Sequence, residues 1–251
     1  MKKHFLITCF IFSSALLFAQ TKFITSGKIE FERKTNVYRL YFSDMENNSF
    51  MEMIKKNTPQ FKIDYFDLIF TEEKSLYRPG RDADVPKKSS FFGSSTATDN
   101  VVYKDLKNET STSNKQVYES KFLLTDSLRR IDWKMLDETR TIAGFECRKA
   151  VGRICDSVVI VAFYTDEIIP SSGPESFSGL PGMILEIAIP RLYTTWVATK
   201  LQLIEPSDEK NIVAPTKGKK ANQKQMMETL DAAIKDWGEK YRDRAVWLST
   251  L

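Results

Sequence analysis

Apolar and polar residues alternate along most of this chain, a pattern typical of β-strands with one buried face. In Lys28–Leu40, for example, Ile29, Phe31 and Arg33 share one face and charged residues occupy the other. Turn signals such as Ala143-Gly144 recur at short spacing, which favours an antiparallel meander over βαβ units. The predicted strands are Lys28–Leu40, Phe61–Thr71, Lys74–Arg78, Val101–Leu106, Gln116–Thr125, Trp133–Arg140, Phe145–Val151, Val158–Thr165, Met183–Ile189 and Thr194–Ile204.

Two segments have helical periodicity instead. Asn47–Lys56 predicts a brief helix that is capped by Asn or Ser and ends before Pro59. In Asn222–Leu248 apolar residues recur at three- and four-residue steps, which predicts one long amphipathic helix at about 222–248. Pro79–Asn100 lacks periodicity and is interpreted as a long surface loop. We therefore predict a mainly β fold (β-rich α+β), in which a large curved antiparallel sheet or incomplete barrel packs against a C-terminal helix.

The first 19 residues have the pattern of a secretory signal peptide. Lys2 and Lys3 precede an apolar run at 5–18, and Ala19 stands at the expected cleavage site. This run is shorter than the ~20 residues that span a bilayer, so no transmembrane segment is expected. Residues 20–251 are then predicted to be a single exported β-rich domain, in the periplasm or at the periphery of the outer membrane.

Charge and histidine content exclude several classes of function. Without the leader the chain has 35 basic and 33 acidic residues, a balance that argues against a nucleic-acid-binding protein. The single histidine, His4, belongs to the leader. The remaining chain therefore has no imidazole for a Ser-His pair or a histidine-ligated metal, and we expect neither a metal site nor a cofactor.

Carboxylates gather in two regions of the sequence. A pair of acids could hydrolyse glycosides if their separation and pKa values were suitable. Most of these acids fall in turns or on the polar face of a strand, so a solvated face is the favoured interpretation. We predict no catalytic residue, and a carboxylate-dependent hydrolase such as a glycosidase remains the alternative function. The acids concerned are Asp64, Asp67, Glu72, Glu73, Asp166, Glu167, Glu175 and Glu186.

A Gly/Pro-rich segment before the strand at 183–189 is the candidate binding region. Pro181 and Gly182 suit the two central positions of a type II turn, which would let Leu180 and Met183 enter the core. Phe177, set among serines and glycine, is interpreted either as a buried plug beneath the loop or as a contact for a ligand or partner. The candidate binding residues are Phe177, Leu180, Pro181, Gly182 and Met183.

Cys147 and Cys155 are the cysteines left after the leader, and an exported protein meets an oxidising environment that permits a disulfide. Direct pairing across a hairpin would need a turn centred on Val151. The apolar pattern instead places the turn at residues 155–157, which would keep the two thiols apart. A disulfide, buried free thiols, and a redox or metal role all remain open.

The sequence Gly-Leu-Pro-Gly-Met-Ile at 179–184 resembles the motif that names the GLPGLI family, secreted proteins found mostly in the Bacteroidota. The likeness includes Trp133-Lys134, the run at 138–150 (ETRTIAGFECRKA), and the run YTDEI at 164–168, followed by Gly173-Pro174 and Phe177. It covers about 133–189. Met183 stands where the family usually has leucine and Phe145 where it has tyrosine, while Cys155 is not part of the pattern.

This resemblance implies an exported β-rich protein of unassigned activity, and it supplies no catalytic residues. The genes of such proteins often lie near TonB-dependent outer-membrane receptors. The expected function is therefore a non-catalytic binding or accessory role in envelope uptake. The expected partner is a TonB-dependent receptor, or a peptide or apolar ligand.

Overall fold

The computed structural model describes residues 23–43, 48–83, 99–155, 157–204, 206–236 and 238–251. The predicted leader and most of the predicted loop at 79–100 lie outside the described residues. Among the helices that are described, none combines the length and the apolar character needed to cross a bilayer.

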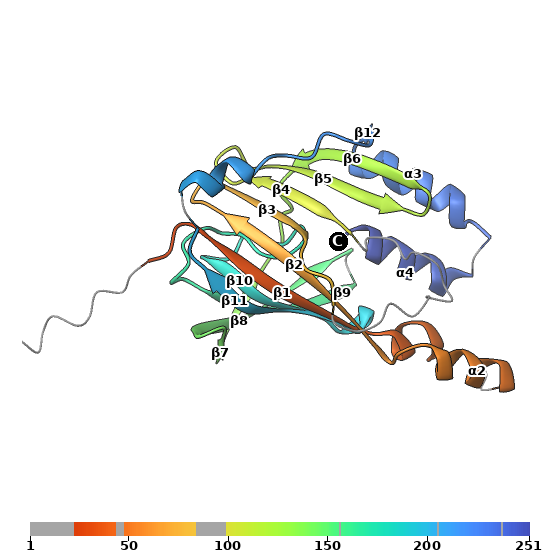
Figure 1. Cartoon of the computed structure of the whole chain (residues 1–251). Helices are drawn as coiled ribbons and strands as arrows, with labels where there is room; N and C mark the ends of the chain where they lie inside the picture. The colour runs from red at the N-terminus through yellow and green to blue at the C-terminus, as the bar shows by residue number, and fades with distance from the viewer. Residues whose placement is uncertain (1–22, 44–47, 84–98, 156, 205, 237) are drawn as a thin grey trace, which may run out of the picture.

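Twelve strands form one sheet in the order β12-β6-β5-β4-β3-β2-β1-β11-β10-β9-β8-β7 (Figure 1). All neighbours pair antiparallel except β12 and β6, which are parallel. The strands are β1 (Gly27–Asn36), β2 (Phe61–Phe70), β3 (Lys74–Pro79), β4 (Val101–Asp105), β5 (Thr110–Val117), β6 (Ser120–Ser127), β7 (Lys134–Ile142), β8 (Phe145–Ile154), β9 (Val158–Thr165), β10 (Met183–Ile189), β11 (Thr194–Gln202) and β12 (Lys219–Ala221). The predicted mainly β fold is confirmed.

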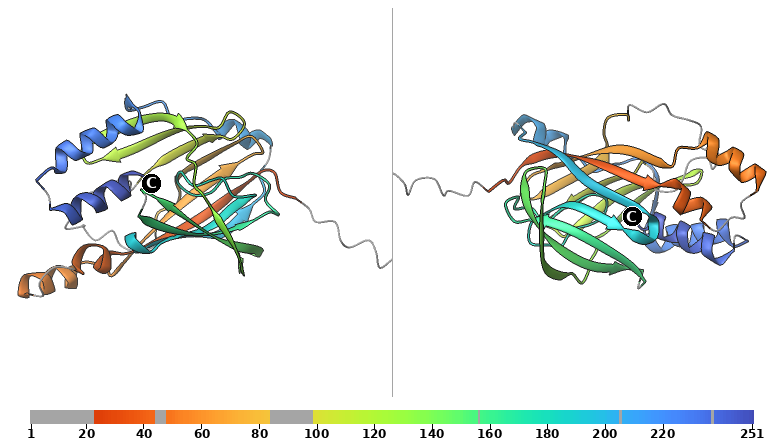
Figure 2. Two further views of the ribbon diagram at one scale, coloured as in Figure 1. Left: turned by 180° about the vertical axis from the view of Figure 1, so that it is seen from behind. Right: turned by 90° about the horizontal axis from the view of Figure 1, so that it is seen from below.

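A single short connection shows that this sheet must curl. β6 ends at Ser127 and β7 begins at Lys134, so the connection spans seven residue steps, at most about 25 Å of extended chain. In a flat sheet these strands would lie ten strand spacings apart, about 48 Å. The sheet therefore bends into a half-barrel, and residues 128–133 cross its open side (Figure 2). We call residues 128–133 the crossing segment.

The interior of the half-barrel is packed with large side chains. Phe31, Phe66, Tyr77 and Trp196 are all at most 1% exposed. The rings of Phe66 and Tyr77 stack with centroids 4.8 Å apart, and Trp196 Nε1 donates a hydrogen bond of 3.2 Å to the Tyr77 hydroxyl. A ring nitrogen that would otherwise be buried without a partner is satisfied in this way.

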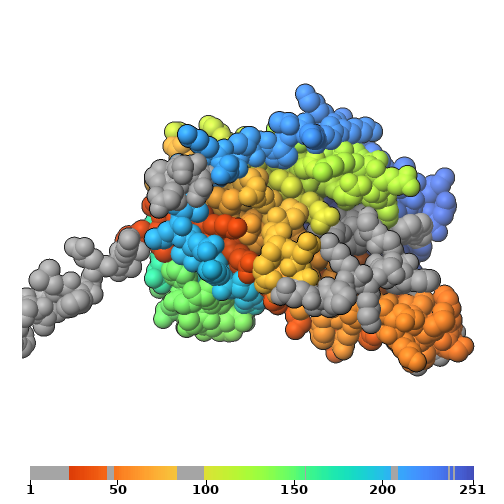
Figure 3. All heavy atoms as spheres, in the orientation of Figure 1, coloured from red at the N-terminus to blue at the C-terminus, as the bar shows by residue number. Residues whose placement is uncertain are grey.

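Helices surround the strands at one end. α2 (Ser49–Asn57) projects from the sheet, as the space-filling view also shows (Figure 3). A π-helical turn, η2 (Tyr38–Phe42), follows β1, and short 3₁₀ turns η3 (Pro190–Leu192) and η4 (Pro206–Asn211) flank β11. α3 (Gln223–Ile234) and α4 (Glu239–Ser249) complete the chain.

The two C-terminal helices close part of the open side. Met226 and Leu230 of α3 and Ala245 of α4 form a second core cluster with Phe122 and Leu124 of β6. Two residues after Ala245 in the same helix, the ring of Trp247 lies 5.0 Å from the Arg191 guanidinium of η3. α4 thus connects the β5–β6 hairpin with the opposite half of the sheet.

Three predicted elements needed correction. The first strand ends at Asn36, because the chain then enters η2. The predicted strand Gln116–Thr125 is in fact a hairpin, in which β5 and β6 meet at Tyr118 (φ 50°) and Glu119. The predicted C-terminal helix is two helices, separated at Gly238, the N-cap of α4. Polar strands and a glycine within a helical pattern are weak signals when only one sequence is read.

The two cysteines are free, Cys147 buried and Cys155 exposed, so the possible disulfide is not formed. β8 runs straight between them and turns only after Ile154, which pairs with Val158. Eight residues of strand place the two Cα atoms roughly 26 Å apart, whereas a disulfide requires less than about 7 Å. The turn position inferred from the apolar pattern is confirmed.

Gly182 has the expected positive φ, 128°. The hydrogen bond expected of a type II turn, from the Met183 N–H to the Leu180 carbonyl oxygen, is not formed. Gly182 N donates to the Leu180 carbonyl at 2.8 Å, while Met183 N donates to Ile168 at 3.0 Å. The tight turn is thus centred on Pro181 alone and is not of type II. A Cβ atom at Gly182 would overlap the carbonyl oxygen of Thr165.

Gly182→Ala is expected to lower the free energy of unfolding by about 2–5 kcal/mol, since it adds a steric clash to backbone strain. Gly144→Ala is the matched control, because Gly144 also has positive φ (90°) yet a Cβ there meets no atom within 4 Å. That variant should lose only about 1 kcal/mol. Urea denaturation measures both, and equal losses would contradict the steric argument.

Candidate functional site

The connection between β9 and β10 occupies the interior of the half-barrel (Figure 2). We call this segment, residues 170–182, the plug loop. Five of its residues are buried: Ser172, Gly173, Pro174, Glu175 and Phe177. A buried loop must find partners for its backbone polar groups within the protein. The polar side chains that supply them come from β3, β4 and the crossing segment.

Lys104 of β4 is the main support of the plug loop. Alternation along β4 directs Val102 and Lys104 to the same buried face, and Lys104 is fully buried. Its Nζ donates to the carbonyl oxygens of Gly173 and Phe177, both at 2.7 Å, and lies 3.4 Å from the Ser172 hydroxyl. One side chain therefore holds both ends of the segment that carries Glu175.

Smaller contacts complete this support. Ser75 of β3 and Ser172 share a hydroxyl–hydroxyl hydrogen bond of 2.8 Å. Trp133, in the crossing segment, donates from Nε1 to the Ser178 carbonyl at 3.0 Å. The plug loop is thus fixed from both the sheet and the open side.

Glu175 is a fully buried carboxylate at the centre of the half-barrel. Its Oε2 accepts a 2.9 Å hydrogen bond from Asn100 Nδ2, and its Oε1 lies 3.8 Å from Arg33 Nη1. Arg33 also forms a 2.8 Å ion pair with Asp64 and lies over the Phe66 ring at 4.5 Å. One guanidinium therefore joins two carboxylates that are distant in the sequence.

The buried charged groups shift one another's pKa values. Burial raises the pKa of Glu175, against the opposing effect of Arg33. Burial would also raise the pKa of Asp64, but Arg33 holds it below its usual value. Burial lowers the pKa of Lys104 to about 7, with Glu175 opposing the shift. A neutral amine still has two N–H groups for its two carbonyl partners, so both protonation states of Lys104 are compatible with the loop.

A second set of cations faces the open side. Lys115 of β5 is buried, and its Nζ lies 3.4 Å from the Ser249 carbonyl oxygen at the end of α4. Burial and, to a smaller extent, the neighbouring Arg129 lower the pKa of Lys115 to about 7. Arg129, in the crossing segment, donates to the carbonyl oxygen of Thr250. Burial also lowers the pKa of Arg129.

Two connected hollows lie along the crossing segment. The inner cavity, about 390 Å³, lies between β5, β6, the plug loop and the start of α3. The outer groove, about 820 Å³, borders β7, β8 and the end of α4. They share Arg129, Arg130 and Gln223. Their charged lining residues are five basic and two acidic: Lys115, Arg129, Arg130, Lys134, Arg153, Asp126 and Asp132.

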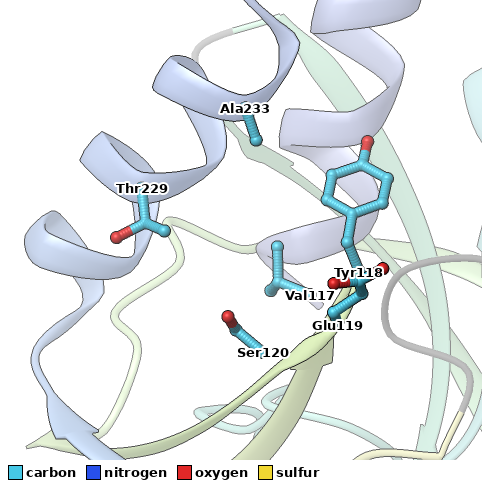
Figure 4. A pocket seen from close by; sticks show the side chains of 6 residues that line it. All are labelled: Val117, Tyr118, Glu119, Ser120, Thr229 and Ala233. Atoms are coloured by element: carbon cyan, nitrogen blue, oxygen red, sulfur yellow. The ribbon is translucent and has the colours of Figure 1, made fainter.

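A third hollow, of about 240 Å³, lies under α3 (Figure 4). It is lined by the β5–β6 turn and by Thr229 and Ala233 of α3, and its only charged residue is Glu119. The cleft formed by the inner cavity and the outer groove is therefore the candidate functional site.

The predicted binding residues lie in the plug loop and its exit, but not in this cleft. Phe177, Leu180 and Met183 are at most 2% exposed and belong to the main core cluster. Gly182 is buried as well, and Pro181 is exposed. Phe177 thus occupies the position expected of a plug, and a role of these residues in binding remains a prediction.

Two of the acidic residues that were expected to face solvent are buried instead. Glu175 is fully buried, and Glu186 is 8% exposed and forms a 2.6 Å ion pair with Arg140. In both cases the tertiary structure supplies a cation that cannot be seen in the sequence pattern. Within the described residues, no cluster of three or more histidine, cysteine, aspartate or glutamate side chains could hold a metal ion.

Sequence reasoning missed Lys104, Lys115, Arg129 and Gln223. The first two had a usable signal, because each lies two residues from a valine that shares its buried strand face, Val102 or Val117. A charged residue at an inward position indicates a buried polar site. Arg129 and Gln223 lie outside the strands, where periodicity gives no orientation.

Residues 152–186 match the family described as Protein of unknown function (Porph_ging), a region that contains β9 and the whole plug loop. No curated protein matches the chain. Two solved structures of PNGF-II, in space groups C2 and P2₁, are similar to it with TM-scores of 0.52 and 0.51 and 15% identity. The alignments cover 81% and 82% of this chain but only 32% and 33% of PNGF-II, so this chain spans about a third of that protein's length. At this identity the likeness concerns the fold alone.

Lys104→Met is expected to be about 2–5 kcal/mol less stable than Lys115→Met, because it leaves two buried carbonyl groups without donors. Both substitutions remove a buried amine, so the cost of burying it cancels in the comparison. Lys115 has a single long contact and serves as the matched control. Urea unfolding at pH 7 measures the difference, and similar stabilities would contradict the supporting role of Lys104.

Lys115 should also make stability depend on pH. Its pKa is about 7 when folded and 10.5 as a free side chain, so the unfolded chain binds more protons between these values. Lys115 should therefore make the free energy of unfolding rise with pH from about 7 to 10, by at most ~1.4 kcal/mol per unit, and Lys104, whose pKa is also about 7, should add a similar rise. Below pH 7 the full cost of burying the ammonium is present. Lys115→Met should show a smaller rise than the parent in urea unfolding at pH 7, 8 and 9.

Proposed function

We propose that this protein is exported to the cell envelope and binds a ligand or partner there without chemically changing it. The observation that carries the proposal is the cleft on the open side of the half-barrel, where five basic side chains face only two acidic ones. Asp126 already accepts a 3.1 Å hydrogen bond from the backbone N–H of Gln223. The cleft is thus suited to binding negative charge.

The apolar ligand expected from the sequence is less well supported than an acidic one. The plug loop and the main core cluster fill the concave side of the sheet, and the inner cavity is lined largely by polar and charged residues. An apolar ligand there would leave those groups without water or hydrogen-bond partners, which is costly. We therefore favour an acidic ligand or partner.

Export and a role near outer-membrane uptake rest on the sequence. The leader-like residues 1–19 support export, and the motif at 179–184 supports the GLPGLI family, whose genes often neighbour TonB-dependent receptors. The Porph_ging match at 152–186 overlaps part of that motif region. A TonB-dependent receptor is accordingly the partner that we propose.

One observation favours the alternative of a carboxylate-dependent hydrolase. Asp64 and Glu175 share Arg33, and their pKa values shift in opposite directions, as in acid pairs that divide catalytic roles. Against this, Glu175 has no exposed surface and borders neither the inner cavity nor the outer groove. A substrate could reach it only if the plug loop moved.

Affinity purification from native envelopes, followed by mass spectrometry, tests the binding proposal. The test variant reverses two exposed cations of the outer groove, Lys134→Glu with Arg153→Glu. The matched control, Lys121→Glu with Lys200→Glu, makes the same charge change at exposed positions elsewhere. We expect a TonB-dependent receptor to be recovered at least tenfold less with the groove variant, while the control resembles the parent. Equal recovery from all three proteins would contradict the proposal.

Hydrolysis of a panel of chromogenic glycosides tests the alternative. We expect no turnover by the parent protein. Turnover that falls about 100-fold in Asp64→Asn or Glu175→Gln, with an unchanged circular dichroism spectrum, would replace the binding proposal with the hydrolase.

A further inference from the structure

Lys115 differs from the other cations of the cleft, because its side chain is almost enclosed by the protein and still borders a hollow. It is 3% exposed and lines the inner cavity. Alternation along β5 places Ser111, Ser113 and Lys115 on one face, and all three line the cavity. Leu124 and Asp126 of β6, the neighbouring strand, line it as well. The regular geometry of the hairpin therefore directs Lys115 toward the cavity.

The cavity is accessible from solvent along β6. Asp126 and Ser127, which line it at the end of that strand, are exposed. A volume of about 390 Å³ lies within the range of small-molecule sites. A small ligand can therefore enter the hollow that Lys115 borders.

The surroundings of Lys115 favour a neutral amine. Within the described residues its Nζ has one hydrogen bond, of 3.4 Å to the Ser249 carbonyl oxygen, whereas an ammonium group has three donors. Of the charged groups around it, Arg129 of the crossing segment disfavours the ammonium form, while Glu175 of the plug loop and Asp126 of β6 favour it. Burial has the largest effect, and the pKa falls to about 7.

A neutral amine has a chemistry that an ammonium lacks. About half of the Lys115 amines are neutral at pH 7, compared with roughly 0.04% for an amine with the ordinary lysine pKa of about 10.4. A lysine that is desolvated and lies beside another cation is a nucleophile that forms Schiff bases with carbonyl compounds. One N–H of Lys115 can donate to Ser249 while the lone pair of the nitrogen is used for the new bond.

We propose that Lys115 binds a small aldehyde or ketone in the inner cavity as a reversible Schiff base. The lone pair of the amine attacks the carbonyl carbon, and a proton moves from the nitrogen to the carbonyl oxygen. The resulting carbinolamine loses water, which leaves a carbon–nitrogen double bond. Addition of water reverses both steps and returns the ligand unchanged. The inference goes beyond the proposed function, because it assigns a covalent bond and does not require a receptor.

Reductive trapping tests this proposal. The chain without the predicted leader is incubated at pH 7 with glyoxylate, which carries a carboxylate, or with neutral propanal. Cyanoborohydride reduces any Schiff base to a stable secondary amine, and peptide mass spectrometry measures the modification rate of each lysine. We expect Lys115 to be modified at least tenfold faster than exposed lysines such as Lys121. A higher rate with glyoxylate than with propanal would show that the ligand also carries an acidic group.

Lys104 is the matched control within the same chain. Burial lowers its pKa to about 7 as well, but its Nζ donates to two carbonyl oxygens at 2.7 Å. It lines neither the inner cavity nor the outer groove. Lys104 should therefore stay unmodified, which separates access through the cavity from the effect of the pKa.

The pH profile gives a second measurement that needs no variant. Between pH 7 and 9 the neutral fraction of an ordinary lysine rises about tenfold per unit, whereas that of Lys115 rises about twofold in total. The rate of modification at Lys115 relative to that at Lys121 should therefore fall at least tenfold over this range.

A pair of variants tests whether the cavity is the route. Ser111→Phe adds a ring on the face of β5 that lines the cavity, and it should slow the modification of Lys115 at least fivefold. Thr112→Phe adds the same ring on the opposite face of β5 and should leave the rate unchanged. Circular dichroism spectra equal to that of the parent would show that both variants fold.

The outcomes are distinct. No adduct at Lys115 with either probe, a rate equal to that of Lys121, or equal rates at Lys104 and Lys115 would overturn the proposal. A fast reaction at Lys115 that Ser111→Phe does not slow would also contradict it. If the trapping fails while the outer-groove charge reversal still reduces receptor recovery, the binding function stands without the covalent step.

Discussion

The interior of this protein depends on the hydrogen bonds of the Lys104 side-chain nitrogen. By donating to the carbonyls of Gly173 and Phe177, it allows a polar loop to lie inside a β-sheet, where backbone groups would otherwise have no partners. Because that loop enters the half-barrel, Glu175 is buried beside Arg33 and Ser176 reaches the inner cavity. A surface loop at this place would have left an open apolar trough in the sheet.

The curvature of the sheet sets the second constraint. A seven-step connection joins strands that lie ten positions apart, so the two edge regions must approach one another. They approach without pairing, and α3, α4 and the crossing segment fill part of the opening. The cleft is the part left unfilled. Its basic lining thus follows from the few residues that happen to face the opening, above all Arg129 and Lys115.

These two constraints separate two groups of polar side chains. Arg33, Asp64, Glu175 and Asn100 satisfy one another within the core, apart from single oxygen atoms. Arg129, Ser176 and Gln223 retain donors that nothing in the described chain accepts. Glu175 of the first group has no exposed surface, whereas the residues of the second group line the cleft. That contrast is the physical reason for preferring binding to catalysis.

The sequence by itself determined the mainly β fold, the bounds of β9 and β10, the β2–β3 hairpin and the turn after Ile154, because alternation and turn residues are local signals. It also indicated the plug loop, through its glycines and prolines. Only the tertiary structure decided that Glu175 is buried and that Arg129, Ser176 and Gln223 line the same cavity. These contacts join segments 47 residues apart or more, and their formation depends on how far the sheet curls. No local pattern encodes that curvature.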